Sequence, residues 1–279
     1  MSMNRIYLYL FALLPMMAFA QSAEQVLSTD SLLVSTGEGD AVALLEDAVE
    51  GASKQAADSA YVAGDYHTAI RQYESLLQGG VNAEVYYNLG NSYFKVDDIA
   101  RAILNYERAL LMSPGNGDIR ANLEIARAKT VDKVVPQPEL FFVNWYLSLR
   151  AVMSVDGWAT VGILTFLIFL IGMGLYFFVT AIQLRKVGFY VAVVSVCLCL
   201  LSNLFAYQQK EIMQRHDKAI ILVPSVTVRS TPSESGTGLF ILHEGHKVSI
   251  KDDSMREWRE IVIEDGKVGW VRLADIGII

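Results

Sequence analysis

Two cysteines and a pair of histidines are the residues of this sequence that are most suited to redox or metal chemistry. Cys197 and Cys199 are the only cysteines, and they lie two residues apart in a long apolar run. On a helix they point to different sides, so a disulfide is not expected, and the cost of a thiolate in hydrocarbon favours a packing role. His243 and His246 have i, i+3 spacing but lack a third metal ligand. We therefore expect no metal and no cofactor.

Sequence motifs for catalysis and for nucleic-acid binding are missing. The chain has no G-x-x-x-x-G-K-[ST], no H-E-x-x-H and no G-x-S-x-G, and the serines of its loops have no base visible beside them. The formal net charge is −7, and binding to a phosphate backbone needs clustered Lys and Arg. We expect a protein that is not an enzyme, has no catalytic residues and binds no nucleic acid.

Two long apolar runs organise the rest of the chain. No charged residue occurs from Gly157 to Ile182 or from Val187 to Tyr207, and each run exceeds the roughly 20 residues that a helix needs to cross a bilayer core. We expect transmembrane helices over 157–182 and 187–207, joined by a turn over 183–186, rather than a buried hairpin in a soluble core. Because neither run contains Asp, Glu, Lys, Arg or His, we expect them to anchor and not to transport.

The N-terminal residues indicate export. Arg5, an apolar segment from Ile6 and the small-residue site Ala18-Phe19-Ala20 form a secretory signal peptide over 1–20. An acidic stretch over 21–50 follows, which we interpret as a flexible arm. The signal peptide predicts a bacterial inner-membrane protein whose turn over 183–186 is cytoplasmic and whose two soluble regions are periplasmic.

A repeat of 33 residues precedes the membrane. Ala69-Ile70 and Tyr73 recur as Ala102-Ile103 and Tyr106, which indicates stacked helix pairs. From residue 83 to 116 the chain resembles the tetratricopeptide repeat, through Tyr86, Leu89-Gly90, Tyr93, Ala102, Tyr106, Ala109 and Pro114. We expect such repeats over 51–130, with Gly90 and Ala102 where helices cross closely and a capping helix from Asp118 to Lys129.

The resemblance implies that the first helix of each pair lines a groove for a ligand. In that register the groove residues are Lys54, Asp58, Tyr61, Tyr87, Asn88, Asn91, Phe94 and Asn122. Some members of the family clamp a terminal carboxylate, but Asp58 and Asp118 place negative charge at those positions here. Docking of a peptide or helix is therefore favoured, and a stack that only positions its neighbours stays open.

An aromatic segment leads into the membrane. Pro136 and Pro138 mark a linker over 131–138. The following stretch over 139–153 is too short to span a bilayer, and Trp145 and Tyr146 suit the headgroup layer. We expect an interfacial helix there.

After a linker over 208–218, short β-type runs predict a small barrel. Val228-Arg229-Ser230-Thr231-Pro232, Leu242-His243-Glu244-Gly245 and the Gly266-Lys267-Val268-Gly269-Trp270-Val271 ending resemble the bacterial SH3 family over 219–279. That family implies binding of protein or cell-wall ligands through surface aromatics. Trp258, which lies among charged residues, is the candidate for the surface, whereas Trp270 is expected in the core.

Taken together, the segments predict a multidomain membrane protein with an all-α tetratricopeptide repeat stack, an α-helical transmembrane hairpin and an all-β SH3-like barrel. Their order, with the Pro-Glu-Leu-Phe-Phe entry to the membrane and the Phe-Ala-Tyr-Gln-Gln exit, resembles the E-type (BatE) family of the Bacteroides aerotolerance (Bat) operon. The resemblance implies a scaffold in a stress-related complex, beside von Willebrand A-type Bat proteins and a MoxR-type ATPase. The alternative is a sensor that binds peptidoglycan through the SH3 module.

Overall fold

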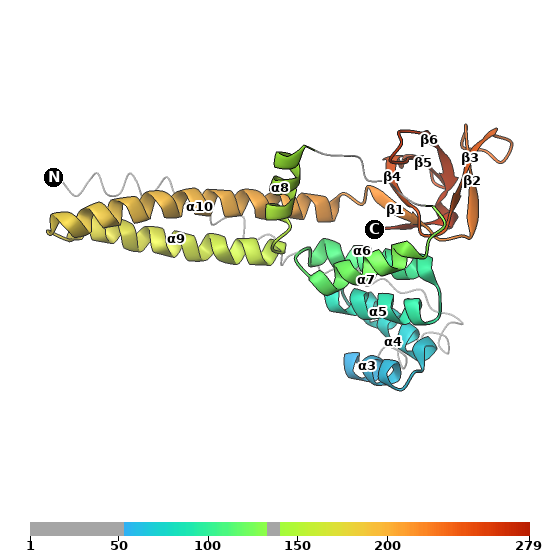
Figure 1. The fold of residues 1–279 in the computed structure, drawn as a ribbon, viewed down its shortest axis with the longest axis horizontal. Helices are drawn as coiled ribbons and strands as arrows, with labels where there is room; N and C mark the ends of the chain where they lie inside the picture. Colours follow the sequence, from blue (N-terminus) through green and yellow to red (C-terminus); the bar gives the residue numbers. More distant parts are fainter. Residues whose placement is uncertain (1–52, 133–139) are drawn as a thin grey trace, which may run out of the picture. The chain divides into compact units, whose positions relative to one another are not determined.

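The computed structural model describes residues 53–132 and 140–279. The expected signal peptide, the acidic arm and most of the linker over 131–138 lie outside these ranges. The described chain contains a helical repeat region, a pair of long apolar helices and a C-terminal antiparallel sheet (Figure 1). The fold class expected from the sequence is confirmed at this level.

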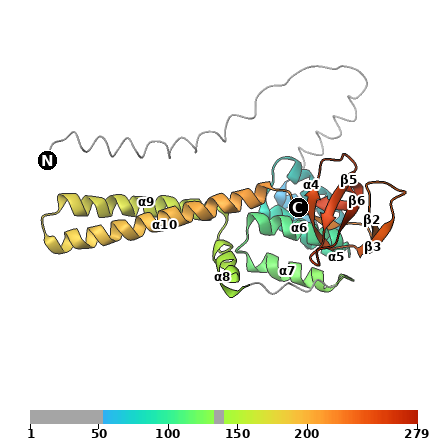
Figure 2. The ribbon, with the colours of Figure 1, turned by 90° about the horizontal axis from the view of Figure 1, so that it is seen from above.

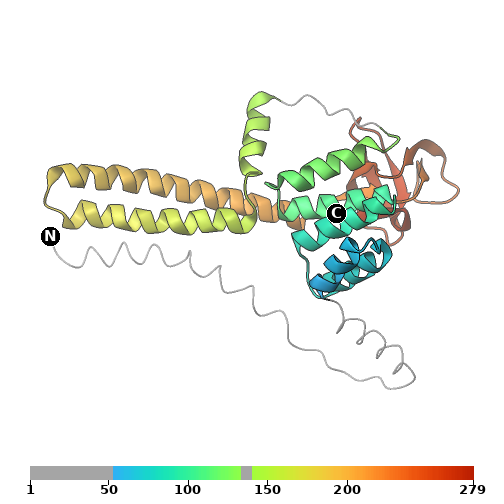
Figure 3. The same cartoon turned by 60° about the horizontal axis from the view of Figure 1, so that its bottom comes forward.

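The repeat region consists of stacked helices (Figure 3). They are α3 (Lys54–Val62), α4 (Tyr66–Gln78), α5 (Ala83–Lys95), α6 (Ile99–Met112) and α7 (Gly117–Ala128). The turns inside the first two helix pairs lie 33 residues apart in the sequence. Gly64 and Asp97 have positive φ angles of 82° and 62°, and the residues after them, Asp65 and Asp98, cap the next helix through their carboxylates.

Small residues let these helices approach closely. Ala57, Ala69, Ala102 and Ala109 are fully buried. A Cβ atom at Gly90 would lie 2.7 Å from Cδ1 of Tyr106, whose ring fills the space between α5 and α6. The expectation that glycine permits a close crossing at this position is confirmed.

Two long apolar helices run side by side, as Figures 1 and 2 show. They are α9 (Val155–Phe178) and α10 (Ile182–Gln214), preceded by the short helix α8 (Phe141–Arg150). Both are long and apolar enough to cross a membrane, and most of their apolar side chains are exposed. Their backbones nearly touch, because a Cβ at Gly188 would lie 2.8 Å from the carbonyl oxygen of Gly172.

The connection between these helices differs from the expected turn. Val179 to Ala181 join α9 to α10, and the polar residues 183–186 form the first turn of α10. These residues are good helix formers, and the guanidinium of Arg185 lies 5.5 Å from the ring centre of Tyr176 on α9. At its other end α10 continues to Gln214 through most of the expected linker, supported by an ion pair between Arg215 and Glu211 at 2.6 Å.

The C-terminal sheet is antiparallel, with strands that lie within residues 218–278. They are β1 (Lys218–Ile221), β2 (Ser225–Arg229), β3 (Gly238–His243), β4 (Lys247–Asp252), β5 (Trp258–Val262), β6 (Val268–Arg272) and β7 (Ile276–Ile278), in the order β3-β2-β6-β5-β4-β1-β7. The first six correspond to the β-type runs of the sequence. β7 was not expected, and it pairs with β1.

The sheet shares a core with the repeat helices. Ile220 and Ile279 belong to the same buried cluster as Ile103 and Tyr106. Nε of Arg108 donates a hydrogen bond of 3.1 Å to the carbonyl oxygen of Ile278. The sheet also has a core of its own around Ile221, Val228 and Ile261, so it packs on the repeat helices in addition to burying its own interior.

Candidate partner-binding groove

A cavity of about 310 Å³ opens between the repeat helices. It is lined by Tyr61, Tyr87, Asn91, Phe94, Lys95, Tyr106, Asn122 and Ile125. Most of these come from α5 and α7 at spacings of three and four residues, which place side chains on one side of a helix. We call this cavity and its lining residues the groove.

Five of the residues predicted from the sequence line the groove: Tyr61, Tyr87, Asn91, Phe94 and Asn122. The other three, Lys54, Asp58 and Asn88, form a separate cluster. Sequence reasoning missed Lys95, Tyr106 and Ile125. Lys95 and Ile125 follow Asn91 and Asn122 by one helical turn and could have been found from that spacing, whereas Tyr106 lies on α6, the second helix of its pair.

Hydrogen bonds hold the polar residues of the groove in place. Oδ1 of Asn91 accepts from the hydroxyl of Tyr106 at 2.8 Å and from Nδ2 of Asn122 at 2.9 Å. The same Nδ2 donates to the hydroxyl of Tyr87 at 3.0 Å. Within the described residues, Nδ2 of Asn91 and Oδ1 of Asn122 make no hydrogen bond. One amide donor and one amide acceptor therefore remain for a ligand.

Aromatic rings form the apolar part of the groove. The rings of Tyr87 and Tyr106 have centres 6.0 Å apart, and burial raises the pKa of Tyr106, so its hydroxyl stays a donor. The ammonium of Lys129 lies 4.5 Å from the ring centre of Phe94 and is paired with Asp97 at 3.0 Å. Phe94 is thereby held at the edge of the groove.

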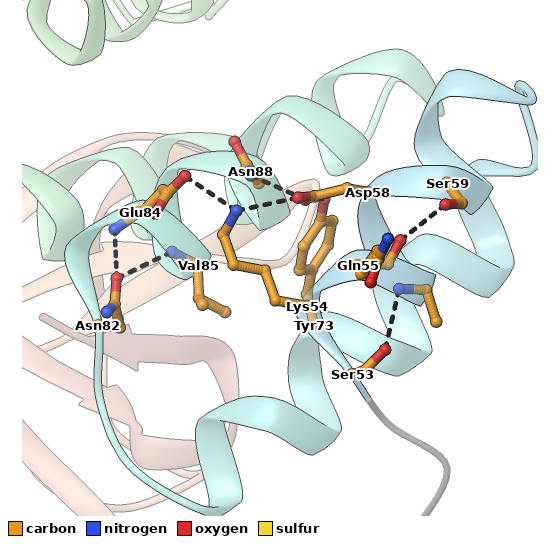
Figure 4. A network of polar contacts seen from close by, with 11 residues as sticks. Ser53, Lys54, Gln55, Asp58, Ser59, Tyr73, Asn82, Glu84, Val85 and Asn88 are labelled. Atoms are coloured by element: carbon orange, nitrogen blue, oxygen red, sulfur yellow. Dashed lines mark hydrogen bonds and ion pairs between the residues drawn. The ribbon is translucent and has the colours of Figure 1, made fainter.

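The cluster around Asp58 joins α3 to the following helices (Figure 4). Its carboxylate accepts hydrogen bonds from Nζ of Lys54 at 2.9 Å, from the hydroxyl of Tyr73 at 2.6 Å and from Nδ2 of Asn88 at 3.3 Å. Burial raises the pKa of Asp58, but the hydrogen bonds from Tyr73 and Lys54 outweigh it and lower the pKa overall. Asp58 is therefore an ionised structural residue.

The Asp58 cluster repeats the geometry of the groove. Asp58 and Tyr73 are each followed 33 residues later by Asn91 and Tyr106, and both tyrosines donate to the residue on the preceding helix. The negative charge of Asp58 disfavours a bound carboxylate at this end. Its partners suit a joint between repeats better than a clamp.

Trp258 lies in a second cavity, of about 250 Å³, on the sheet. The cavity is lined by Ser225, Val226, Thr227, Arg229, Glu234, Trp258, Arg272 and Asp275. The guanidinium of Arg272 lies 5.8 Å from the ring centre of Trp258, and Glu234 forms ion pairs with Arg272 and Arg229.

The expectation that Trp270 lies in the core was wrong. Trp270 is half-buried, whereas its neighbours Gly269 and Val271 are buried. The alternation of β6 explains the difference, because successive side chains of a strand point to opposite faces. The inward positions of this strand are Gly269 and Val271.

The histidine pair lies at the junction of sheet and repeats. Asp132, which follows α7, contacts Nδ1 of His243 at 2.9 Å and Nδ1 of His246 at 3.7 Å. The backbone N–H of His243 also donates to Asp132 at 2.8 Å. Among the described residues no group of three His, Cys, Asp or Glu side chains could hold a metal ion. The contacts with Asp132 instead connect two segments of the fold.

A buried carboxylate strengthens the same junction. Glu107 of α6 is 5% exposed and pairs with Nζ of Lys247 on β4 at 2.6 Å and with Arg127 of α7 at 2.5 Å. Burial raises the pKa of Glu107, but the two cations outweigh it and lower the pKa. The carboxylate is therefore ionised, and Lys247 completes its neutralisation from the sheet.

Comparison with known proteins finds one repeat family within this region. Residues 83–116 match the family model of the tetratricopeptide repeat, and this stretch contains Tyr87, Asn91, Phe94, Lys95 and Tyr106. Comparison of the chain with curated proteins and with solved structures finds no match. The matched repeat suggests interaction with other proteins.

Proposed function

We propose that this protein is a non-enzymatic, membrane-anchored adaptor that binds a segment of a partner protein in the groove of its repeats. The observation that supports the proposal is the groove itself, an open cavity on a matched tetratricopeptide repeat in which aromatic rings alternate with amides. Such a surface fits a peptide segment, because its rings can contact apolar side chains and its amides can form hydrogen bonds with the main chain of the peptide.

The groove residues divide these tasks. Tyr61, Tyr87 and Phe94 supply rings for an apolar side chain of the partner. Nδ2 of Asn91 and Oδ1 of Asn122 supply a donor and an acceptor for the partner's main chain. Lys95, which has no ion-pair partner among the described residues, favours a partner segment that carries a carboxylate at that edge.

Anchoring and sidedness form a second part of the proposal. The helices α9 and α10 cross the inner membrane once each, and the signal peptide places the repeats and the sheet in the periplasm. A reporter enzyme that is active only outside the cytoplasm, fused after Ile279, tests this orientation. Activity of the fusion is expected, and an inactive fusion beside an active cytoplasmic reporter would contradict it.

The resemblance to the E-type family of the aerotolerance operon indicates which kinds of protein the partners are. We propose that they are von Willebrand A-type Bat proteins acting with a MoxR-type ATPase in stress tolerance. The order of repeats, apolar helix pair and sheet supports this proposal, with the sheet taken as a bacterial SH3 module.

A second candidate function is cell-wall sensing. The cavity at Trp258 favours it, because Arg229 and Arg272 beside an indole ring suit a ligand with carboxylates, such as the stem peptide of peptidoglycan. Retention of the full solubilised chain on purified peptidoglycan, lost with Trp258→Ala, would support this function. Equal retention of both proteins would exclude the cavity as the site.

The adaptor function is tested by partner recovery from membranes. Chemical crosslinking followed by affinity purification of the full chain should recover fewer partners with the double variant Tyr87→Ala and Phe94→Ala. Val81→Ala is the matched control, because Val81 is exposed and lies outside the groove. Unchanged recovery with the double variant would refute a role of the groove.

A further inference from the structure

The short helix before the apolar pair exposes aromatic side chains. α8 has no buried residue, and Phe141 and Trp145 are 85% and 68% exposed. Their spacing of four residues places both on one side of the helix, and the exposed ring of Phe142 flanks them. An exposed aromatic set of this kind marks an interaction surface.

A side of α8 next to these exposed rings is attached to the long helices. The ring of Tyr146 packs edge-on against Phe205 of α10 with centres 5.8 Å apart, and its hydroxyl donates to the side chain of Gln208. Trp158 of α9 lies 4.9 Å from the same Phe205 ring and donates from Nε1 to the carbonyl oxygen of Arg150 at 3.0 Å. These contacts fix which side of α8 remains exposed.

The contact point on α10 coincides with the end of its apolar run. The apolar run ends at Tyr207, and the polar residues Gln208 and Gln209 and the charged Lys210 follow. α8 itself has 10 residues, which gives a length of about 15 Å, half of the roughly 30 Å of a bilayer core. It can lie at a membrane boundary but cannot cross.

We propose that the side of α8 that carries Phe141, Phe142 and Trp145 binds the headgroup layer of a phospholipid bilayer. The exposed Asn144 and Ser148 suit that layer better than hydrocarbon, and aromatic rings are enriched there. The inference rests on the proposed function in one respect, that α9 and α10 cross the membrane. α8 then sets the bilayer surface at Phe205, and the last turns of α10 lie outside.

The test is the depth of Trp145 in phospholipid nanodiscs that each hold one full-length chain. The Trp145 signal is the fluorescence of the unaltered chain minus that of Trp145→Phe. Lipids brominated near the headgroup or near the chain end report depth, and aqueous iodide reports exposure to water. For comparison, Val194→Trp in the Trp145→Phe background places an indole at an exposed position in the middle of α10.

We expect headgroup-side bromines to quench Trp145 more than chain-end bromines, with the indole about 5–10 Å into the boundary layer and protected from iodide. For the indole of Val194→Trp, chain-end bromines should quench more than headgroup-side bromines. Quenching of Trp145 by iodide alone, or protection from both quenchers by a protein surface, overturns the proposal for α8. If Val194→Trp also escapes bromine quenching, the membrane-spanning part of the proposed function fails with it.

Discussion

The carboxylate of Glu107 lies 2.6 Å from the ammonium group of Lys247, although 140 residues separate them in the sequence. Glu107 belongs to α6, which also contributes Tyr106 to the groove, and Lys247 begins β4. The junction with the sheet and the groove therefore use adjacent residues of one helix.

The first prediction concerns this ion pair. Lys247→Met leaves the buried Glu107 with Arg127 alone, so the free energy of unfolding should fall by about 1–3 kcal/mol. Denaturant unfolding of the solubilised chain measures it. The control is Lys251→Met, which removes the exposed partner of Glu260 and should cost less than about 1 kcal/mol. Equal effects of both variants would contradict a special role of Lys247.

A second prediction concerns pH. Burial lowers the pKa of His246 below the usual histidine value of about 6.5, although Asp132, Glu264 and Asp265 act in the opposite direction. As the pH falls below about 6.5, the unfolded chain takes up this proton first, so the folded state loses stability. His246→Phe should flatten the decline in thermal stability between about pH 7 and pH 5. His67→Gln, at an exposed position of α4, should leave it unchanged.

The third prediction concerns the helix crossing in the matched repeat. Gly90→Ala drives a methyl group into the buried ring of Tyr106, which should cost about 1–3 kcal/mol through overpacking, offset in part by the better helix propensity of alanine. The melting temperature followed by circular dichroism should fall by several degrees. Gly117→Ala meets no atom within 4 Å and should be neutral or stabilising. A Gly90→Ala variant with the melting temperature of the unaltered protein would contradict the close crossing of α5 and α6.

Local patterns of the sequence predicted the repeats, the apolar pair and most strands. The 33-residue period is visible in the structure. Gly64 and Asp97 have positive φ angles at equivalent turns, and Tyr73 and Tyr106 each donate a hydrogen bond to the preceding helix. The connection between α9 and α10 differs from the expected turn because polar residues are also good helix formers. Here Val179 and Thr180 leave the helix, and the polar residues begin the next one.

The junction of sheet and repeats could not be predicted from local patterns. Contacts such as Asp132 with His243 and Arg108 with Ile278 join residues that are more than 100 positions apart and leave no periodic signal. β7 has only 3 residues, too few for an alternating pattern. Five residues of the groove could be named because the resemblance to the tetratricopeptide repeat assigns the first helix of each pair to a groove, whereas Tyr106 lies on α6, the second helix of its pair.

The most direct test of partner binding in the groove is site-specific photocrosslinking in native membranes. A photoreactive residue replaces Ile125, which lines the groove, or the exposed Val81 outside it. We predict a discrete adduct with a partner protein from position 125, none from position 81, and loss of the adduct when Tyr87→Ala and Phe94→Ala are added. Equal adducts from both positions, or an adduct at position 125 that survives the double variant, would contradict binding of a partner in the groove.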